Sequence, residues 1–146
     1  MQLSNYIKIE EVKRVCQELG IRDWTTLTNS NVFDDEARII QSEVGAEALE
    51  IPLEEFRLGL EVELEHGITF PDANVTNNHP ILTGKIVLAH LKEMLDYYLR
   101  LEVAELEGDI LNARASGDNE KLASKYEQLI DARATLAQRE SEQLKG

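Results

Sequence analysis

The chain has 146 residues, about the size of one domain, and its 28 acidic and 15 basic residues give a net charge of −13 at pH 7. This charge repels nucleic-acid phosphates and anionic lipid headgroups, so we expect no nucleic-acid partner and no membrane partner. The single cysteine, Cys16, excludes an internal disulfide framework, and no long apolar run suggests export or a membrane span. We therefore expect a reduced, cytoplasmic protein.

Helical periodicity starts near the N-terminus. The pattern predicts a first helix over Ile9–Leu19, with Gly20 as a left-handed cap. Apolar residues then recur every three to four positions from Phe33 to Ala48 and predict a second helix, which Gly45 weakens.

A third helix follows Pro52, a residue that suits the first turn of a helix. Its apolar stripe consists of Leu53, Phe56, Leu60 and Leu64. The segment Glu61–Glu65 also alternates with the period of a strand, but the longer stripe favours a helix. We expect Gly67 to end this helix and a turn-rich loop to follow over residues 69–79.

The sequence pattern of the C-terminal half predicts two helices. Pro80 can open a fourth helix, which we expect to run from Ile81 to about Ala115 because it contains no proline. After the turn Ser116-Gly117-Asp118, a last helix rich in charged pairs completes a helical hairpin. The predicted fold class is all-α: a small helical bundle with a long central helix and a C-terminal helical hairpin.

Two tetrapeptides on neighbouring predicted helices could carry chemistry. Glu63-Leu64-Glu65-His66 and His90-Leu91-Lys92-Glu93 each place a carboxylate and an imidazole three residues apart, on one helix face. In antiparallel helices His66 would face His90, and Glu63 would face Glu93. Because two imidazoles and two carboxylates form a suitable ligand set, the pattern predicts a site for zinc, iron or manganese.

Other polar residues could support this site. His90 shares a helical row with Ile86 and Met94, so we expect its ring to point inward. Tyr97 and Glu65 are candidates to orient the ligands from a second layer, while His79 in the loop is a weaker candidate for a fifth ligand. Most histidines of this kind are plain core or surface residues, and that alternative stays open.

Two other functions remain open from the sequence. Residues 34–72 contain twelve acidic side chains but only two basic ones, Arg38 and Arg57, and this acidic patch could bind a basic protein partner. In that case the Glu–His pairs would be buried salt bridges that specify the fold. The pairs could also act as acid and base in an enzyme, although no nucleophile motif or phosphate-binding loop is present.

The segment Phe56–Leu101 resembles a known family. It contains VELEHG at residues 62–67, Asn74-Val75-Thr76, and TGKIVLAHLKE at residues 83–93 followed by Asp96-Tyr97-Tyr98. These boxes resemble an uncharacterised family of small prokaryotic and phage proteins, whose hallmark is an ELEHG box followed by a GKIALAHLxExPDYYxRL box. The resemblance supplies no reaction, but it implies that the residues of the predicted site belong to one shared pattern.

The chain departs from that pattern at two places. Asn77-Asn78-His79 stands where acidic residues are usual, which argues against a carboxylate ligand from the loop. Met94-Leu95 replaces a Phe-Pro pair, so we expect the fourth helix to continue without a kink.

The predicted organisation is one helical domain over residues 1–146. It comprises N-terminal helices over 1–50, a family core over 51–101 and the C-terminal hairpin over 102–146, through which the chain could form a homo-oligomer.

Overall fold

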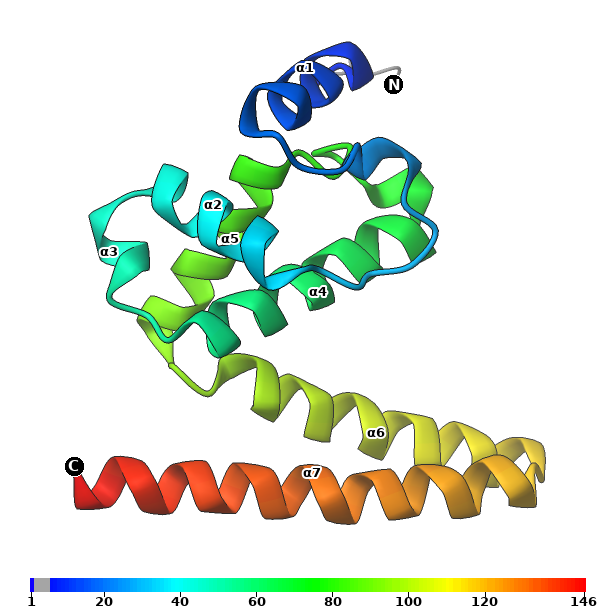
Figure 1. Cartoon of the computed structure of the whole chain (residues 1–146). Coiled ribbons are helices and arrows are strands. Elements are labelled where there is room, and N and C mark those ends of the chain that lie inside the picture. Colours follow the sequence, from blue (N-terminus) through cyan, green and yellow to red (C-terminus); the bar gives the residue numbers. More distant parts are fainter. Residues whose placement is uncertain (2–5) are drawn as a thin grey trace. The chain divides into compact units, whose positions relative to one another are not determined.

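The computed structural model describes residues 1 and 6–146, and every regular element in this part of the chain is a helix (Figure 1). The predicted all-α fold class is confirmed. The chain divides into two compact units, Met1–Leu95 and Asp96–Gly146. No helix among the described residues is long and apolar enough to cross a membrane. The single-domain organisation stays a prediction, and each unit is described by itself.

The first helix, α1, spans Ile9–Leu19, as its periodicity predicts. Its cap, Gly20, has φ +68°, a left-handed conformation that costs glycine little. The amide of Ile21 donates to the carbonyl of Cys16 at 3.1 Å and completes the cap. Cys16 itself is buried and therefore packs as a small core residue.

The predicted second helix is broken in two. Helix α2 spans Asp34–Val44 and the short helix α3 spans Ala46–Leu49. Gly45 lies between them with φ +127° and ψ −178°, a conformation open to glycine but not to residues with a side chain. The single continuous helix expected up to Ala48 is therefore wrong, and the glycine that weakened it is the point of interruption.

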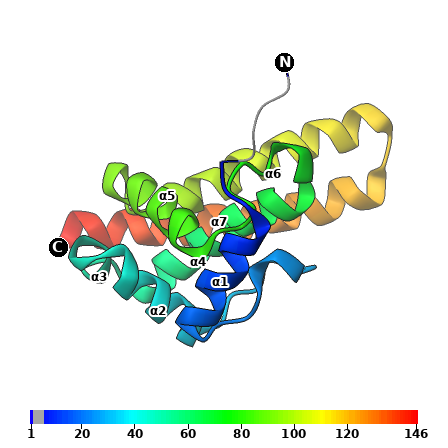
Figure 2. The ribbon, with the colours of Figure 1, turned by 90° about the horizontal axis from the view of Figure 1, so that it is seen from above.

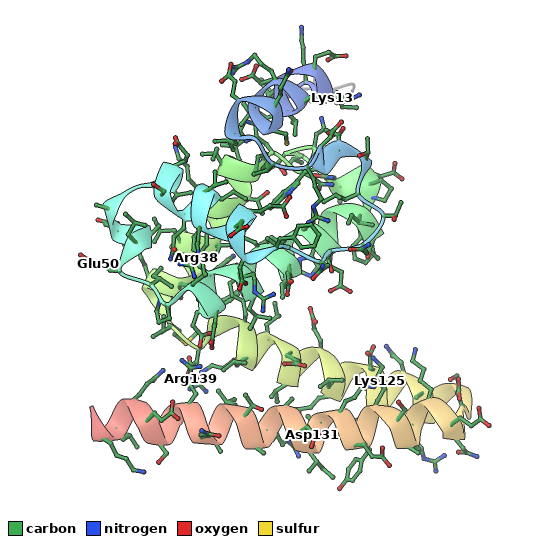
Figure 3. The ribbon with its side chains drawn as sticks, viewed as in Figure 1. Lys13, Arg38, Glu50, Lys125, Asp131 and Arg139 are labelled. Carbon is green, nitrogen blue, oxygen red and sulfur yellow. The ribbon has the colours of Figure 1, made fainter. Side chains whose placement is uncertain are left out.

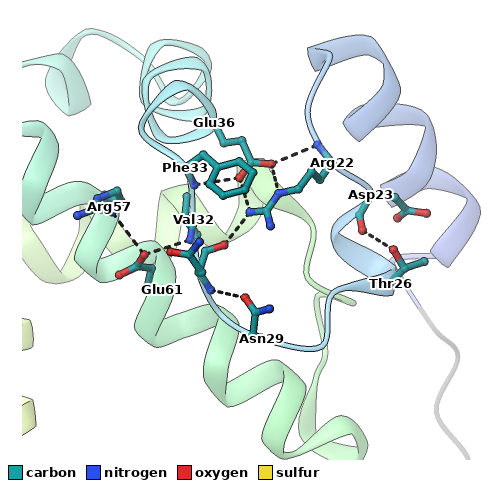
Figure 4. Close-up of polar contacts among 10 residues, drawn as sticks. Arg22, Asp23, Thr26, Asn29, Val32, Phe33, Glu36, Arg57 and Glu61 are labelled. Atoms are coloured by element: carbon teal, nitrogen blue, oxygen red, sulfur yellow. Dashed lines mark hydrogen bonds and ion pairs between the residues drawn. The ribbon is translucent and has the colours of Figure 1, made fainter.

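One carboxylate ties the start of α2 to the segment that follows α1 (Figure 4). Glu36 is buried and accepts hydrogen bonds from the Arg22 guanidinium at 2.6 and 2.8 Å. It also accepts from the backbone amides of Arg22 and Phe33, at 3.2 and 3.1 Å. The guanidinium and the amide donors lower the pKa of Glu36 against the opposing effect of burial. This carboxylate is thus part of the fold and does not offer its charge to a partner.

Glu61 has a similar structural role (Figure 4). Its carboxylate accepts from the amide of Val32 at 3.1 Å and lies 3.8 Å from the Arg57 guanidinium. Arg57 also pairs with Asp34 at 3.2 Å. Glu61 therefore anchors the chain that leads into α2.

Helix α4 spans Leu53–Thr69 and continues two residues past Gly67, where its end was predicted. The predicted stripe is correct at Phe56, Leu60 and Leu64, all of which are buried. Two short 3₁₀ helices, η1 at Trp24–Thr26 and η2 at Pro71–Ala73, lie in the connecting segments.

The predicted long fourth helix is two helices, α5 over Pro80–Glu93 and α6 over Tyr97–Ser116. Met94 is extended, with φ −148° and ψ 125°, so α5 ends before it. Asp96 then precedes α6, and its carboxylate pairs with Arg100 one turn later at 2.8 Å. An acidic residue is favourable at a helix N-terminus, which makes Asp96 a start signal. The prediction of one helix from Ile81 to Ala115 failed because it relied on the absence of proline.

The core of the first unit depends on a close approach of α5 to α2 and α4 (Figures 1 and 2). Gly84 of α5 is buried at this contact. A β-carbon at Gly84 would lie 2.7 Å from Cγ2 of Val44, 2.8 Å from Cγ2 of Ile40 and 3.4 Å from the ring of Phe56. Gly84 is therefore a packing glycine, because its lack of a side chain lets α5 approach α2 and α4 closely.

The second unit is a hairpin of α6 and α7, and α7 spans Asn119–Lys145 (Figure 1). Gly117, at φ +73°, ends α6, and the carboxylate of Asp118 accepts the amide of Lys121 at 3.0 Å to cap α7. Apolar side chains between the two helices include Leu106, Leu129 and Ala132. Lys125 lies on α7 (Figure 3). Its ammonium pairs across the hairpin with Asp109 at 2.9 Å. The predicted C-terminal hairpin is thus confirmed.

We predict that Gly84→Ala destabilises the first unit by about 1–2 kcal/mol. The β-branched side chains of Ile40 and Val44 are stiff within their helix, so the added methyl group overpacks the contact. Urea unfolding followed through Trp24, the only tryptophan, reports on this unit.

The matched control is Gly108→Ala in the interior of α6, where a β-carbon would meet nothing within 4 Å. Replacing this exposed helical glycine should stabilise the hairpin by about 0.5–1 kcal/mol, measured by circular dichroism. If Gly84→Ala raised the free energy of unfolding as Gly108→Ala does, the packing role of Gly84 would be contradicted.

Candidate functional site

Helices α4 and α5 bring three of the four predicted ligands together. Glu63 Oε2 lies 3.9 Å from His66 Nδ1, one turn along α4. Glu63 Oε1 lies 3.7 Å from His90 Nε2, which α5 contributes. The two oxygens of one carboxylate therefore each face an imidazole nitrogen.

The register of the two helices differs from the predicted one. Glu63 was expected opposite Glu93, but it lies against His90. Glu93 is exposed and joins no ion pair within the described part of the chain. Glu65 is also exposed, and Tyr97 begins α6 in the other unit, where its ring makes an edge contact with Tyr98 at 5.1 Å between centroids. Within the first unit, the structure therefore gathers Glu63, His66 and His90.

The three side chains are only partly shielded from water. The exposed fraction is 19% for Glu63, 33% for His90 and 46% for His66. The expectation that His90 follows an inward row is not met, because Ile86 and Met94 of that row are exposed. The buried row of α5 is instead the neighbouring one, which includes Val87 and Leu91.

The present spacing of these side chains is that of ion pairs. Ligands of one tetrahedral metal ion, at bonds of about 2.0–2.2 Å, lie about 3.3 Å from one another. Accordingly, no group of three or more His, Cys, Asp or Glu side chains in residues 1 and 6–146 is arranged so that it could hold a metal ion as it stands. A bound ion would require the Glu63, His66 and His90 side chains to move closer together.

An open cavity of about 210 Å³ adjoins Glu63 and His66. Its walls come from the C-terminal end of α4, the loop that contains η2, and the first half of α5. The lining is mainly apolar, and three of the lining side chains, Phe70, Val75 and Ile86, are themselves exposed. The cluster of Glu63 and His66 therefore forms the polar edge of a small apolar hollow.

Asparagine side chains fix the loop that walls this cavity. Asn74 Nδ2 donates to the carbonyl of Gly67 at 3.2 Å and to Asn78 Oδ1 at 2.8 Å. Asn77 and Asn78 adopt positive φ values of 50° and 60°, which asparagine tolerates better than most residues. A β-carbon at Gly67 would overlap with Asn78 Oδ1 and lie 2.9 Å from Asn74 Nδ2. Gly67 thus allows the loop to lie against α4, and it does not end that helix.

His79 closes the same loop and caps α5. Its Nδ1 accepts the backbone amides of Ile81 at 3.2 Å and Leu82 at 3.4 Å. The side chain is buried, and burial lowers the pKa of the imidazole. His79 is therefore a helix cap, a role that the sequence analysis missed, although the pair His79-Pro80 at a helix start offered a signal for it.

The chain belongs to the protein family DUF5661, described as a protein of unknown function, whose model matches residues 12–107. The predicted resemblance to an uncharacterised family is confirmed, and the match extends on both sides of the segment Phe56–Leu101 that suggested it. Among curated proteins and among solved structures, none matches the chain.

We predict an energetic coupling between Gly67 and Asn78. Gly67→Ala should destabilise the first unit by about 1–3 kcal/mol, because the new methyl group displaces the asparagine side chains. Asn78→Gly keeps the positive φ accessible and removes the overlapping oxygen. The cost of Gly67→Ala, measured by urea unfolding, should therefore be smaller by at least about 0.5 kcal/mol in the Asn78→Gly background. Strict additivity of the two changes would argue against the close approach.

Proposed function

We propose that this protein binds a divalent transition-metal ion through Glu63, His66 and His90. The observation that carries the proposal is that both oxygens of Glu63 face imidazole nitrogens, 3.9 and 3.7 Å away, on two packed helices. Two imidazoles and one carboxylate form a donor set suited to zinc, iron or manganese. The proposal drops Glu93, which lies exposed outside this group.

The partial exposure of the three side chains supports the proposal. His66 is nearly half exposed and occupies one helix face with Glu63, so small rotations of both side chains can shorten the ligand distances. The ion would bind with fewer than four protein ligands and would keep positions for water or another molecule, as in open metal sites. The adjoining cavity, at the edge of which Glu63 and His66 lie, is where such a molecule would sit.

Electrostatics favour a cation at this place. Residues 1–95 contain 17 acidic and 8 basic side chains, a net charge of −9. An excess of negative charge raises the local concentration of cations and speeds their association.

The proposed metal site can be tested by mass spectrometry of metals in untagged protein purified without chelator. We expect close to one zinc, iron or manganese ion per chain in the wild type, and its loss from the variant with both His66→Ala and His90→Ala. Circular dichroism would establish that this variant folds.

Glu93→Gln is the matched control. Glu93 lies on α5, as His90 does, but it is outside the group formed by Glu63, His66 and His90. The variant should retain the metal of the wild type. A folded, metal-free wild type would overturn the proposal, and loss of metal from Glu93→Gln would overturn the three-ligand arrangement.

We also propose, as the second candidate function, a protein-interaction module. The observation in its favour is that Tyr126 and Ile130, one turn apart on α7, are exposed to 56% and 53%. Such outward apolar residues are suited to pairing with another helix, for example that of a second copy. The acidic patch lends less support, since Glu36 and Glu61 within it are engaged inside the fold.

A further inference from the structure

His79 satisfies every free backbone donor at the start of α5. A helix leaves its first amides without intrahelical partners, and here Pro80 has no amide hydrogen to leave. Nδ1 of His79 accepts the amides of Ile81 and Leu82, while its carbonyl oxygen accepts the amide of Thr83 at 2.9 Å. One residue therefore caps the whole N-terminus of the helix.

This cap works in only one protonation state. Nδ1 accepts hydrogen bonds when it carries no proton, and then the proton of the neutral ring lies on Nε2. Protonation would turn Nδ1 into a donor that faces two further donors. It would also place a positive charge at the positive end of the helix dipole, in a buried position.

The charged groups that face His79 come from α1. Glu11 stabilises the protonated ring and Arg14 opposes it. These two side chains are hydrogen-bonded to each other at 2.9 Å, and the hydrogen bond from Arg14 lowers the pKa of Glu11. Glu11 therefore stays ionised at mildly acid pH and does not itself titrate there.

The cap formed by His79 also joins the two segments that line the cavity beside Glu63 and His66. His79 follows Asn78, and the loop before it contributes Phe70, Ala73, Asn74, Val75 and Thr76 to the cavity. The first half of α5 contributes Thr83, whose hydroxyl donates to the carbonyl of His79 at 2.9 Å, and Ile86. The loop and the helix that form two sides of the hollow thus meet at His79.

We propose that His79 is a pH-dependent latch of this cavity wall. In its neutral form it caps α5 and fixes the loop over residues 70–78 against α4. Protonation in mildly acid solution releases the cap and loosens the loop and the first turn of α5. The latch depends on contacts of His79 alone and does not require a bound metal.

The sign of the pH effect follows from the direction of the pKa shift. Burial lowers the pKa of His79 in the folded chain below the ordinary value of 6.5. Above about pH 6.5 the histidine is neutral in both the folded and the unfolded chain and stability does not depend on it. As the pH falls below 6.5, the unfolded chain takes up a proton first and the folded state loses stability. The latch opens in the folded chain once the pH falls below the lowered pKa.

Hydrogen exchange of the Ile81 and Leu82 amides tests the latch, measured between pH 7.5 and 5.0 and corrected for the intrinsic rate. In the wild type we expect protection to fall by up to about tenfold for each pH unit between 6.5 and the lower pKa of His79 in the folded chain, and to level off below that pKa. His79→Asn, which can cap a helix but does not titrate, should keep its protection constant over this range. The variant with His66→Ala and His90→Ala should respond as the wild type does.

The proposal is overturned if wild-type protection does not change with pH, or if His79→Asn loses protection in parallel with the wild type. Should His79→Asn fail to fold, His79→Ser supplies a second non-titrating cap. Independently, an NMR titration of the three histidines would overturn the latch if the pKa of His79 were 6.5 or higher.

Discussion

The close packing of α5 against α2 and α4 at Gly84 is the constraint on which the first unit depends. Because Gly84 has no side chain, Ile40, Val44 and the Phe56 ring can lie where a β-carbon would otherwise exclude them. This approach sets the register of α5 along α4. It therefore also determines that His90 lies against Glu63 and that Glu93 remains in solvent.

The second constraint is the loop that returns the chain from α4 to α5. Gly67 lets the amide group of Asn74 and the side chain of Asn78 pack onto α4, and His79 fastens the far end of the loop to α5. The residues that fix the loop also surround the cavity beside Glu63 and His66. Structural and candidate functional residues are thus interleaved in one stretch of sequence, so neither role can be read from residue type alone.

Periodicity predicted the helices wherever one face is apolar and the end carries a strong signal, as at α1 with Gly20 and at the hairpin turn with Gly117. Periodicity failed where contacts between helices determine the helix ends and the buried face. The break between α5 and α6 carries no proline or glycine, and the two apolar rows of α5 differ in burial because only one faces α2 and α4. Helical spacing correctly predicted that Glu63 and His66 lie together. The register between two helices depends on their packing, which cannot be predicted from the spacing within each helix.

We propose that Glu63, His66 and His90 form a metal site, whereas His79, the remaining histidine of the chain, caps α5. Imidazole ¹H–¹⁵N NMR spectra recorded during a zinc titration test this claim most directly. We expect the side-chain resonances of His66 and His90 to change up to one equivalent of zinc, those of His79 to stay constant, and the changes to disappear in Glu63→Ala. Unchanged spectra of His66 and His90, or a response confined to His79, would contradict the account.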